Sequence, residues 1–151
     1  WGGTIPQFTG DSIYAIFGAP DSKGERVDAL ACLSMALEMQ ERMITLREKW
    51  WNQGIQFPFE IRCGIHTGMA NVGNYGSEGF MEYSAIGLNT NLASRLEQAC
   101  EPGEIYLSHA TWALVKEEFS CEEVGTIEVK GFHYPIQTYR VIQNIVEMAA
   151  S

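Results

Sequence analysis

The longest periodic segment of the sequence runs from about residue 25 to residue 52. Apolar side chains recur there at i, i+3, i+7 and i+14, which places Leu30, Leu33, Leu37 and Ile44 on one face of a helix. Charged residues fill many of the other positions, and Gly54 is a signal for the end of the helix. The pattern predicts one long amphipathic helix.

Short strand patterns lie on both sides of this helix. Alternating, β-branched and aromatic runs predict strands at 2–8, 12–17, 57–65, 69–75, 81–86, 105–107, 119–130 and 135–142. Two shorter helices are predicted at 89–100 and from Ser108, an N-cap residue, to about 116. The order β-β-α-β-β-β-α-β-α-β-β is that of a mixed α+β domain. We find no internal repeat, and the one candidate linker is the tail from about Gln143.

Composition and charge restrict the classes of function. The 151 residues are 46% hydrophobic and 19% charged, which excludes a disordered tail and a disulfide-stapled miniprotein. The formal net charge of −9 predicts a surface that repels nucleic acid, so a bound polyanion would need metal ions or a few well-placed cations. The four cysteines lack metal-site or redox-motif spacing, and we interpret them as buried free thiols. No apolar run approaches the ~18 residues of a membrane span.

Three polar features are candidates for chemistry. Asp11 stands at the predicted tip of the first hairpin, where its carboxylate could bind a hard cation, although Asp also favours turns without any ligand. Asn91 and Arg95 share a helix face, which suits a sugar oxygen beside a phosphate but also describes an ordinary solvated face. Lys130, at a strand end, could reach a phosphate or only protect a strand edge. His66 is interpreted as structural, because the histidines lack zinc spacing.

Four groups of segments, taken in order along the chain, form a joint signature: 8–18 (FTGDSIYAIFG), 64–68 (GIHTG) with 72–74 (VGN), 83–87 (YSAIG) with 91–96 (NLASRL), and 129–131 (VKG) with 138–139 (TY). Together they resemble one family, the catalytic domains of class III nucleotidyl cyclases. In this order they resemble its second metal-binding hairpin, the hairpin after it, its Y-x-x-x-G…N-x-A-x-R signature and its C-terminal hairpin. Each motif is weak alone, but their joint order and spacing are specific. The similarity runs from Trp1 to about Ile142.

The resemblance implies a ferredoxin-like cyclase fold with a mixed, mostly antiparallel sheet, and a homodimer with active sites shared across the interface. It implies conversion of a nucleoside triphosphate to a 3′,5′-cyclic monophosphate and pyrophosphate, in intracellular signalling. In the family, two Mg²⁺ or Mn²⁺ ions assist the attack of the ribose 3′-OH on the α-phosphate. Carried over by position, Asp11 would bind metal and Asn91 would orient the ribose. Arg95 would stabilise charge at the α-phosphate, and Lys130 would touch the terminal phosphates.

The sequence departs from the family pattern at three places. The family's opening strand, with an aspartate in an F-x-D-x-x-G-F pattern, does not precede Trp1, so we expect an excised piece with half of the metal site. Gln7 stands where adenylyl cyclases have Lys and guanylyl cyclases Glu. Ser84 stands where adenylyl cyclases have Asp or Thr and guanylyl cyclases often Cys. An amide and a hydroxyl can serve either base, and the Thr-like Ser84 favours ATP over GTP.

These observations predict an adenylate cyclase domain at residues 1–142, incomplete at its N-terminal side, with a tail at 143–151. The alternatives are a guanylyl cyclase making cyclic GMP, and a degenerate, non-catalytic cyclase-like dimerisation module. We expect a cytoplasmic domain behind an upstream sensor or membrane module, with no nucleic-acid partner.

Overall fold

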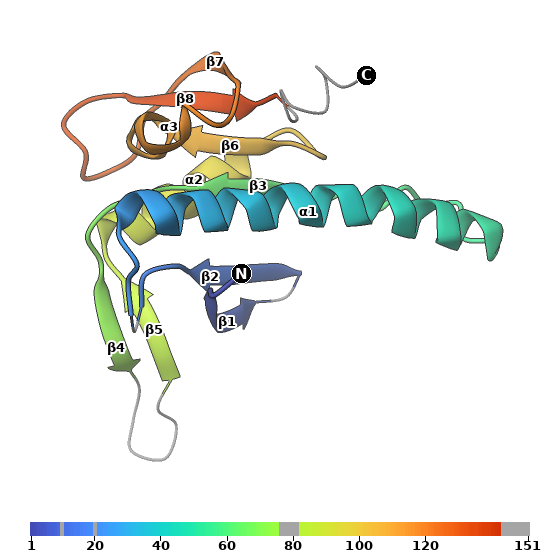
Figure 1. Cartoon of the computed structure of the whole chain (residues 1–151), viewed down its shortest axis with the longest axis horizontal. Helices are drawn as coiled ribbons and strands as arrows, with labels where there is room; N and C mark the ends of the chain where they lie inside the picture. Colours follow the sequence, from blue (N-terminus) through green and yellow to red (C-terminus); the bar gives the residue numbers. More distant parts are fainter. Residues whose placement is uncertain (10, 20, 76–81, 143–151) are drawn as a thin grey trace.

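The computed structural model describes residues 1–9, 11–19, 21–75 and 82–142 (Figure 1). The predicted tail at 143–151 and residues 76–81, which include the first residue of the predicted strand at 81–86, lie outside the described residues. The elements follow the predicted order, and the α+β class is confirmed. They are β1 (Thr4–Thr9), β2 (Ser12–Ile16), α1 (Glu25–Asn52), β3 (Cys63–Ile65), β4 (Asn71–Tyr75), β5 (Glu82–Ile86), α2 (Leu88–Ala99), β6 (Ile105–Ser108), α3 (His109–Val115), β7 (Cys121–Ile127) and β8 (Ile136–Val141).

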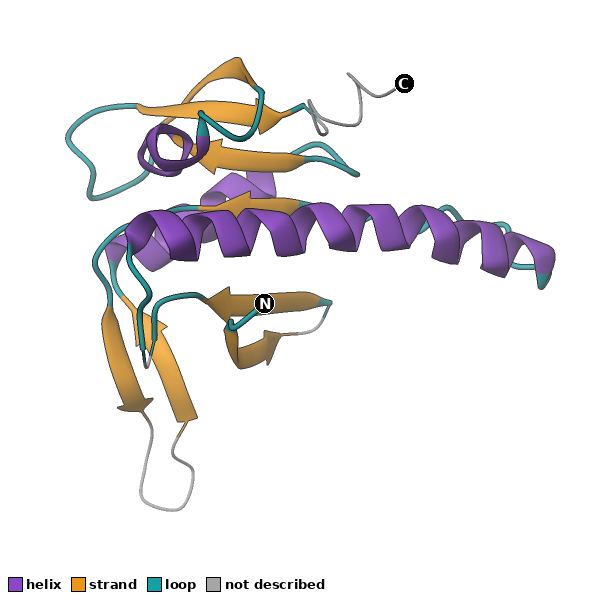
Figure 2. Ribbon diagram, viewed as in Figure 1, coloured by secondary structure: helices purple, strands orange, loops and turns teal. Residues whose placement is uncertain are grey.

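The described strands form three sheets, and the mixed, mostly antiparallel pairing that the resemblance implies is confirmed. Two are antiparallel hairpins, β1 with β2 and β4 with β5. The third has the order β3-β6-β8-β7, in which β3 and β6 are parallel and the other pairs are antiparallel. Figure 2 shows the two hairpins on one side of α1 and the four-stranded sheet on the other. β3 therefore lies at an edge of the large sheet, next to α1.

The four-stranded sheet has a helix-covered core on each face. On one face, α1 and α3 pack through Leu33 and Val115 against Ile65 and Leu107 of the sheet. On the other face, α2 packs through Leu92 and Leu96 against residues of the β7–β8 region. Figure 1 shows α2 behind the sheet and α1 in front of it. The two clusters explain why the sheet residues alternate between two apolar faces.

The long helix α1 has the predicted bounds, but its buried face is shorter than the sequence predicts. Its buried residues, Ala29, Leu33, Ala36 and Gln40, all lie between residues 29 and 40, and none lies in the last twelve residues of the helix. Ile44, which the periodicity places on the same face, is 54% exposed, because the second half of α1 extends past the sheet (Figure 1). Within the described chain, no helix is both long and apolar enough to cross a membrane.

The predicted strand at 57–65 is limited to β3 at its C-terminal end. Pro58 has no N–H to give to a sheet ladder. Phe59 contacts the ring of Trp50 on α1, with ring centroids 5.4 Å apart, and its carbonyl oxygen accepts a hydrogen bond from Arg47. The apolar alternation of this segment thus reflects packing on α1 and not strand pairing.

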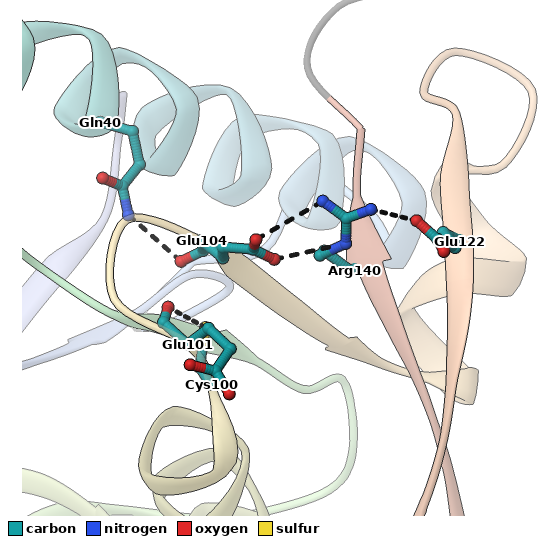
Figure 3. Close-up of polar contacts among 6 residues, drawn as sticks. All are labelled: Gln40, Cys100, Glu101, Glu104, Glu122 and Arg140. Carbon is teal, nitrogen blue, oxygen red and sulfur yellow. Dashed lines mark hydrogen bonds and ion pairs between the residues drawn. The ribbon is translucent and has the colours of Figure 1, made fainter.

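Polar contacts join α1 to one end of the sheet (Figure 3). The buried Gln40 amide donates to the backbone oxygens of Ile61, at 3.0 Å, and of Glu104, at 3.1 Å. Arg140 on β8 pairs with Glu104 and with Glu122, which lie on either side of it. These two carboxylates, Glu122 first, raise the pKa of Arg140 above its ordinary value. These ion pairs join β8 to β7 and to the residue just before β6 at one end of the sheet.

The predicted free thiols are confirmed. All four cysteines are free, and Cys100 is buried while the others are half-buried. Burial raises the pKa of Cys32 to about 12 and that of Cys63 to about 11. Thiols with so little thiolate at neutral pH are poor nucleophiles, so these groups serve the core.

Candidate active site

Helix α2 presents the predicted pair of polar side chains to solvent. Leu92 and Leu96 are 0% exposed and hold the helix on the sheet. Asn91 and Arg95 each precede one of these leucines and are exposed. The prediction that Asn91 and Arg95 share a helix is confirmed. Their exposure makes an amide and a guanidinium available to a ligand, a combination suited to a sugar oxygen beside a phosphate.

A glycine in β3 allows α2 to lie directly on the sheet. A Cβ added at Gly64 would lie 2.3 Å from the backbone nitrogen of Glu97 and 2.8 Å from the carbonyl oxygen of Ala93. Both are backbone atoms of α2, so no side-chain rotation would relieve the contact. Gly64 therefore sets the distance between β3 and the helix that carries Arg95.

His66, just after β3, contacts both α2 and β6. Its Nε2 lies 2.8 Å from Oδ1 of Asn89, and its Nδ1 lies 2.6 Å from Oγ of Ser108. Burial lowers the pKa of His66 below its ordinary value, and the hydrogen bond to Asn89 opposes that shift. The interpretation of His66 as structural agrees with these contacts. Ser108 caps α3 as predicted, accepting a hydrogen bond from the backbone N–H of Thr111.

Lys130 stands in the loop between β7 and β8 and not at a strand end as predicted, because β7 already ends at Ile127. This loop touches the start of α2. Val129 is buried in the same cluster as Leu92. Gly131 lies so close to Leu88 that an added Cβ would be 2.5 Å from its Cδ2. Lys130 is exposed and lines a shallow cavity of about 300 Å³ formed by residues 128–135. The fold thus brings the loop of Lys130 to the first turn of α2.

The remaining site candidates lie on the hairpins. Gln7 pairs with Tyr14 across the β1–β2 hairpin, and Ser84 pairs with Gly73 across the β4–β5 hairpin. The side chains of Gln7 and Ser84 lie outside the described part of the structure. β1 lies against β5, and β5 lies against α2. The two candidate base-reading positions therefore stand on neighbouring strands, of which β5 lies next to the helix of Asn91.

Asp11 is exposed in the turn between β1 and β2. Among the described residues, no hydrogen bond or ion pair joins it to Asn91, Arg95 or Lys130. The described chain also contains no group of three or more His, Cys, Asp or Glu that could hold a metal ion. Asp11 alone is an available ligand and not a complete metal site.

Comparison with known proteins identifies the family. The profile of the adenylate and guanylate cyclase catalytic domain matches residues 7–143. The chain belongs to this family. The cyclase domain is 48% identical to the adenylyl cyclase CyaB from P. aeruginosa, whose crystal structure it matches with a TM-score of 0.91 over 95% of this chain and 73% of that one. The crystal structure of the guanylyl cyclase Cya2 is 33% identical, with a TM-score of 0.84 over 93% of this chain and 70% of that one.

The curated relatives are much longer than this cyclase domain. Adenylate cyclase 1 of Rhizobium meliloti is 34% identical over 143 residues, which are 93% of this chain and 21% of the relative. The domain thus spans about a fifth of that protein's length.

One residue of the cyclase domain's polar network was not among the sequence predictions. Asn89 lies two positions before Asn91 and joins α2 to His66. Its amide nitrogen also donates to the carbonyl oxygen of Met69 at 2.6 Å. The sequence carries no local signal for this role, because Asn89 meets His66 only in the folded chain, 23 residues apart.

Proposed function

We propose that this cyclase domain converts ATP to 3′,5′-cyclic AMP and pyrophosphate. The observation that carries the proposal is the exposed pair Asn91 and Arg95 on α2, with the loop of Lys130 packed against the first turn of the same helix. These are the groups that an in-line displacement at a triphosphate needs on the protein side: orientation of the sugar and cations for the phosphates. The similarity to CyaB and to adenylate cyclase 1 supports ATP.

The proposed reaction joins two atoms of one substrate molecule. The ribose 3′-OH releases its proton to solvent water, and its oxygen bonds to the α-phosphorus. The bond from the α-phosphorus to the bridging oxygen of the β-phosphate breaks, and pyrophosphate leaves. Asn91 holds the ribose so that the 3′-oxygen faces the α-phosphorus. Arg95 stabilises the negative charge that grows on the α-phosphate oxygens, and Lys130 binds the terminal phosphates.

Of the ligands that the two Mg²⁺ or Mn²⁺ ions implied by the resemblance would need, the described residues identify one, Asp11. Asp11 is one exposed carboxylate, and a hard divalent cation takes several oxygen ligands. No cluster of three candidate ligands exists in the described chain. The two ions, and Asp11 as their ligand, stay a prediction, and the steps above use only Asn91, Arg95 and Lys130.

The nucleobase is the less constrained part of the proposal. Gln7 and Ser84 are proposed to read the base, which agrees with the adjacent positions of β1 and β5. An amide and a hydroxyl each donate and accept hydrogen bonds, so the pair is compatible with adenine and with guanine. The likeness to the guanylyl cyclase Cya2 keeps cyclic GMP as the alternative product.

A homodimer with shared sites is part of the proposal. Within the described chain, no hydrogen bond or ion pair joins Asp11 to Asn91 or Arg95. This is expected if one protomer supplies the metal ligand and its partner supplies α2. Sedimentation of the full-length protein with nucleotide and Mn²⁺ should show a dimer. A strict monomer at high concentration would contradict the shared site.

The catalytic roles are tested by cyclic nucleotide production in the full-length protein with ATP, GTP and Mg²⁺ or Mn²⁺. We expect Arg95→Ala to lower turnover by about 10²-fold, the effect of removing one charge-stabilising group. Arg42→Ala, which removes an exposed arginine of α1, is the matched control and should keep wild-type turnover. An unchanged rate in Arg95→Ala would remove its role, and no product from the wild-type protein with either nucleotide would favour the non-catalytic module.

A further inference from the structure

The segment from Gly64 to Gly68 has two faces, one packed in the core and the other against α2. Ile65 and Thr67 face the core under α1 and α3: Ile65 is buried there, and the Thr67 hydroxyl lies 2.9 Å from that of Thr111. Gly64, His66 and Gly68 face α2. A Cβ added at Gly64 would overlap the α2 backbone, and one at Gly68 would lie 2.4–2.6 Å from the amide atoms of Asn89.

The hydrogen bonds around His66 can be satisfied in only one direction. The Asn89 amide nitrogen donates to the Met69 carbonyl, which turns Oδ1 of Asn89 toward His66. An amide oxygen only accepts, so Nε2 of His66 must carry the proton. Nδ1 of the neutral ring then accepts from the hydroxyl of Ser108. His66 thereby links the first turn of α2 to the end of β6.

Apart from the apolar contact of Leu88 with the loop of Gly131, the first turn of α2 is weakly anchored. Its N-cap is Gly87, with no side-chain capping bond. Leu88 is 50% exposed, and Leu92, one turn later, is the first fully buried residue of the helix. The side chain of Asn89 is therefore the polar anchor of this turn, and it precedes Asn91 by two residues.

We propose that His66 is a positioning residue, which fixes the first turn of α2 through Asn89 and so places Asn91 and Arg95 against the nucleotide. The inference rests on the proposed function, in which those two side chains touch substrate. A helix end that shifts by about 1 Å can lose about 10²-fold in rate without losing the fold.

Two amide substitutions at His66 separate its two links. In His66→Gln the amide nitrogen reaches the position of Nε2 and can still donate to Asn89, whereas in His66→Asn the shorter amide reaches only the position of Nδ1 and the side of Ser108. Both substitutions remove the ring. In the full-length protein we expect turnover of His66→Gln within about threefold of wild type. We expect turnover of His66→Asn to fall about tenfold to a hundredfold, with KM for the nucleotide within about twofold.

Asn89→Ala, alone and combined with His66→Asn, tests whether the two residues act together. If His66 acts through Asn89, Asn89→Ala should match His66→Asn, and combining the two should add no further loss. Hydrogen exchange of the backbone amides at 88–95 should be faster in His66→Asn and Asn89→Ala but near wild type in His66→Gln. Equal turnover and equal exchange in the Gln and Asn variants would overturn the inference.

The exchange measurement also separates the two proposals. An inactive wild-type protein would refute the proposed function, and the exchange pattern would then decide the His66–Asn89 link without any activity. An active wild-type protein with independent, additive losses in the double variant would refute the link and leave the proposed function standing.

Discussion

Gly64→Ala should move α2 by a distance that the structure defines. The new Cβ would lie 2.3 Å from the backbone nitrogen of Glu97, and an ordinary contact begins at 3.4 Å, so the helix must withdraw by about 1.1 Å (3.4 − 2.3). The atoms of Ala93 and Glu97 that it meets are backbone, which cannot rotate away. Overpacking of this kind costs about 1–3 kcal/mol. A shift of about 1 Å in a helix that positions reacting groups can also cost about 10²-fold in rate.

The assay for Gly64→Ala is thermal unfolding together with cyclic nucleotide production by the full-length protein. Gly73→Ala is the matched control, because Gly73 is also a strand glycine and an added Cβ there meets nothing within 4 Å. We expect a lower unfolding midpoint and a lower turnover for Gly64→Ala only. Equal unfolding midpoints and equal turnover in the two variants would refute the idea that Gly64 sets the distance between β3 and α2.

Three further predictions follow from the site and the core. We expect Asn91→Ala to lower turnover by at least about tenfold, because the ribose would no longer be held with its 3′-oxygen facing the α-phosphorus. Gln98→Ala on the same helix should keep wild-type turnover. Equal rates in the two variants would remove Asn91 from the site. Burial lowers the pKa of His66 below the ordinary value of 6.5, so below that pH the unfolded chain binds a proton more readily than the folded protein does. The free energy of unfolding should therefore reach its full value above pH 6.5 and decrease as the pH falls below 6.5. Denaturant midpoints of wild type and His66→Gln at pH 7.5 and 5.5 measure this contribution, and an equal pH dependence in both proteins would contradict it. Cys32 and Cys63, with pKa values of about 12 and 11, should resist iodoacetamide at pH 7.5 until the protein unfolds, and rapid labelling of the native protein would contradict their burial.

Local patterns were sufficient to predict the order of elements and the position of α2. The capping residue Ser108 and the stop at Gly54 act within one or two turns of chain, so sequence alone revealed them. The extent of burial on α1 could not be predicted in this way. Ile44 has the right spacing but lies beyond the end of the sheet, and the length of the sheet is a tertiary property.

The sequence was sufficient to name most residues of the candidate site, but only part of their spatial arrangement. Asn91 and Arg95 share a helix face because of their spacing, and the structure shows both exposed. The role of Asn89 depends on its contact with His66, 23 residues earlier, and no local pattern gives such a contact. The division of the described strands into three sheets could not be read from local patterns either, because pairing between distant strands is set by the packing of the whole chain.

The most direct test is to give the full-length protein an equimolar mixture of ATP and GTP with Mn²⁺ and to quantify both cyclic products by mass spectrometry. We predict cyclic AMP as the main product, and its loss in Arg95→Ala. Cyclic GMP as the main product would contradict the assignment of the base, and the absence of both products would contradict the proposed cyclase activity.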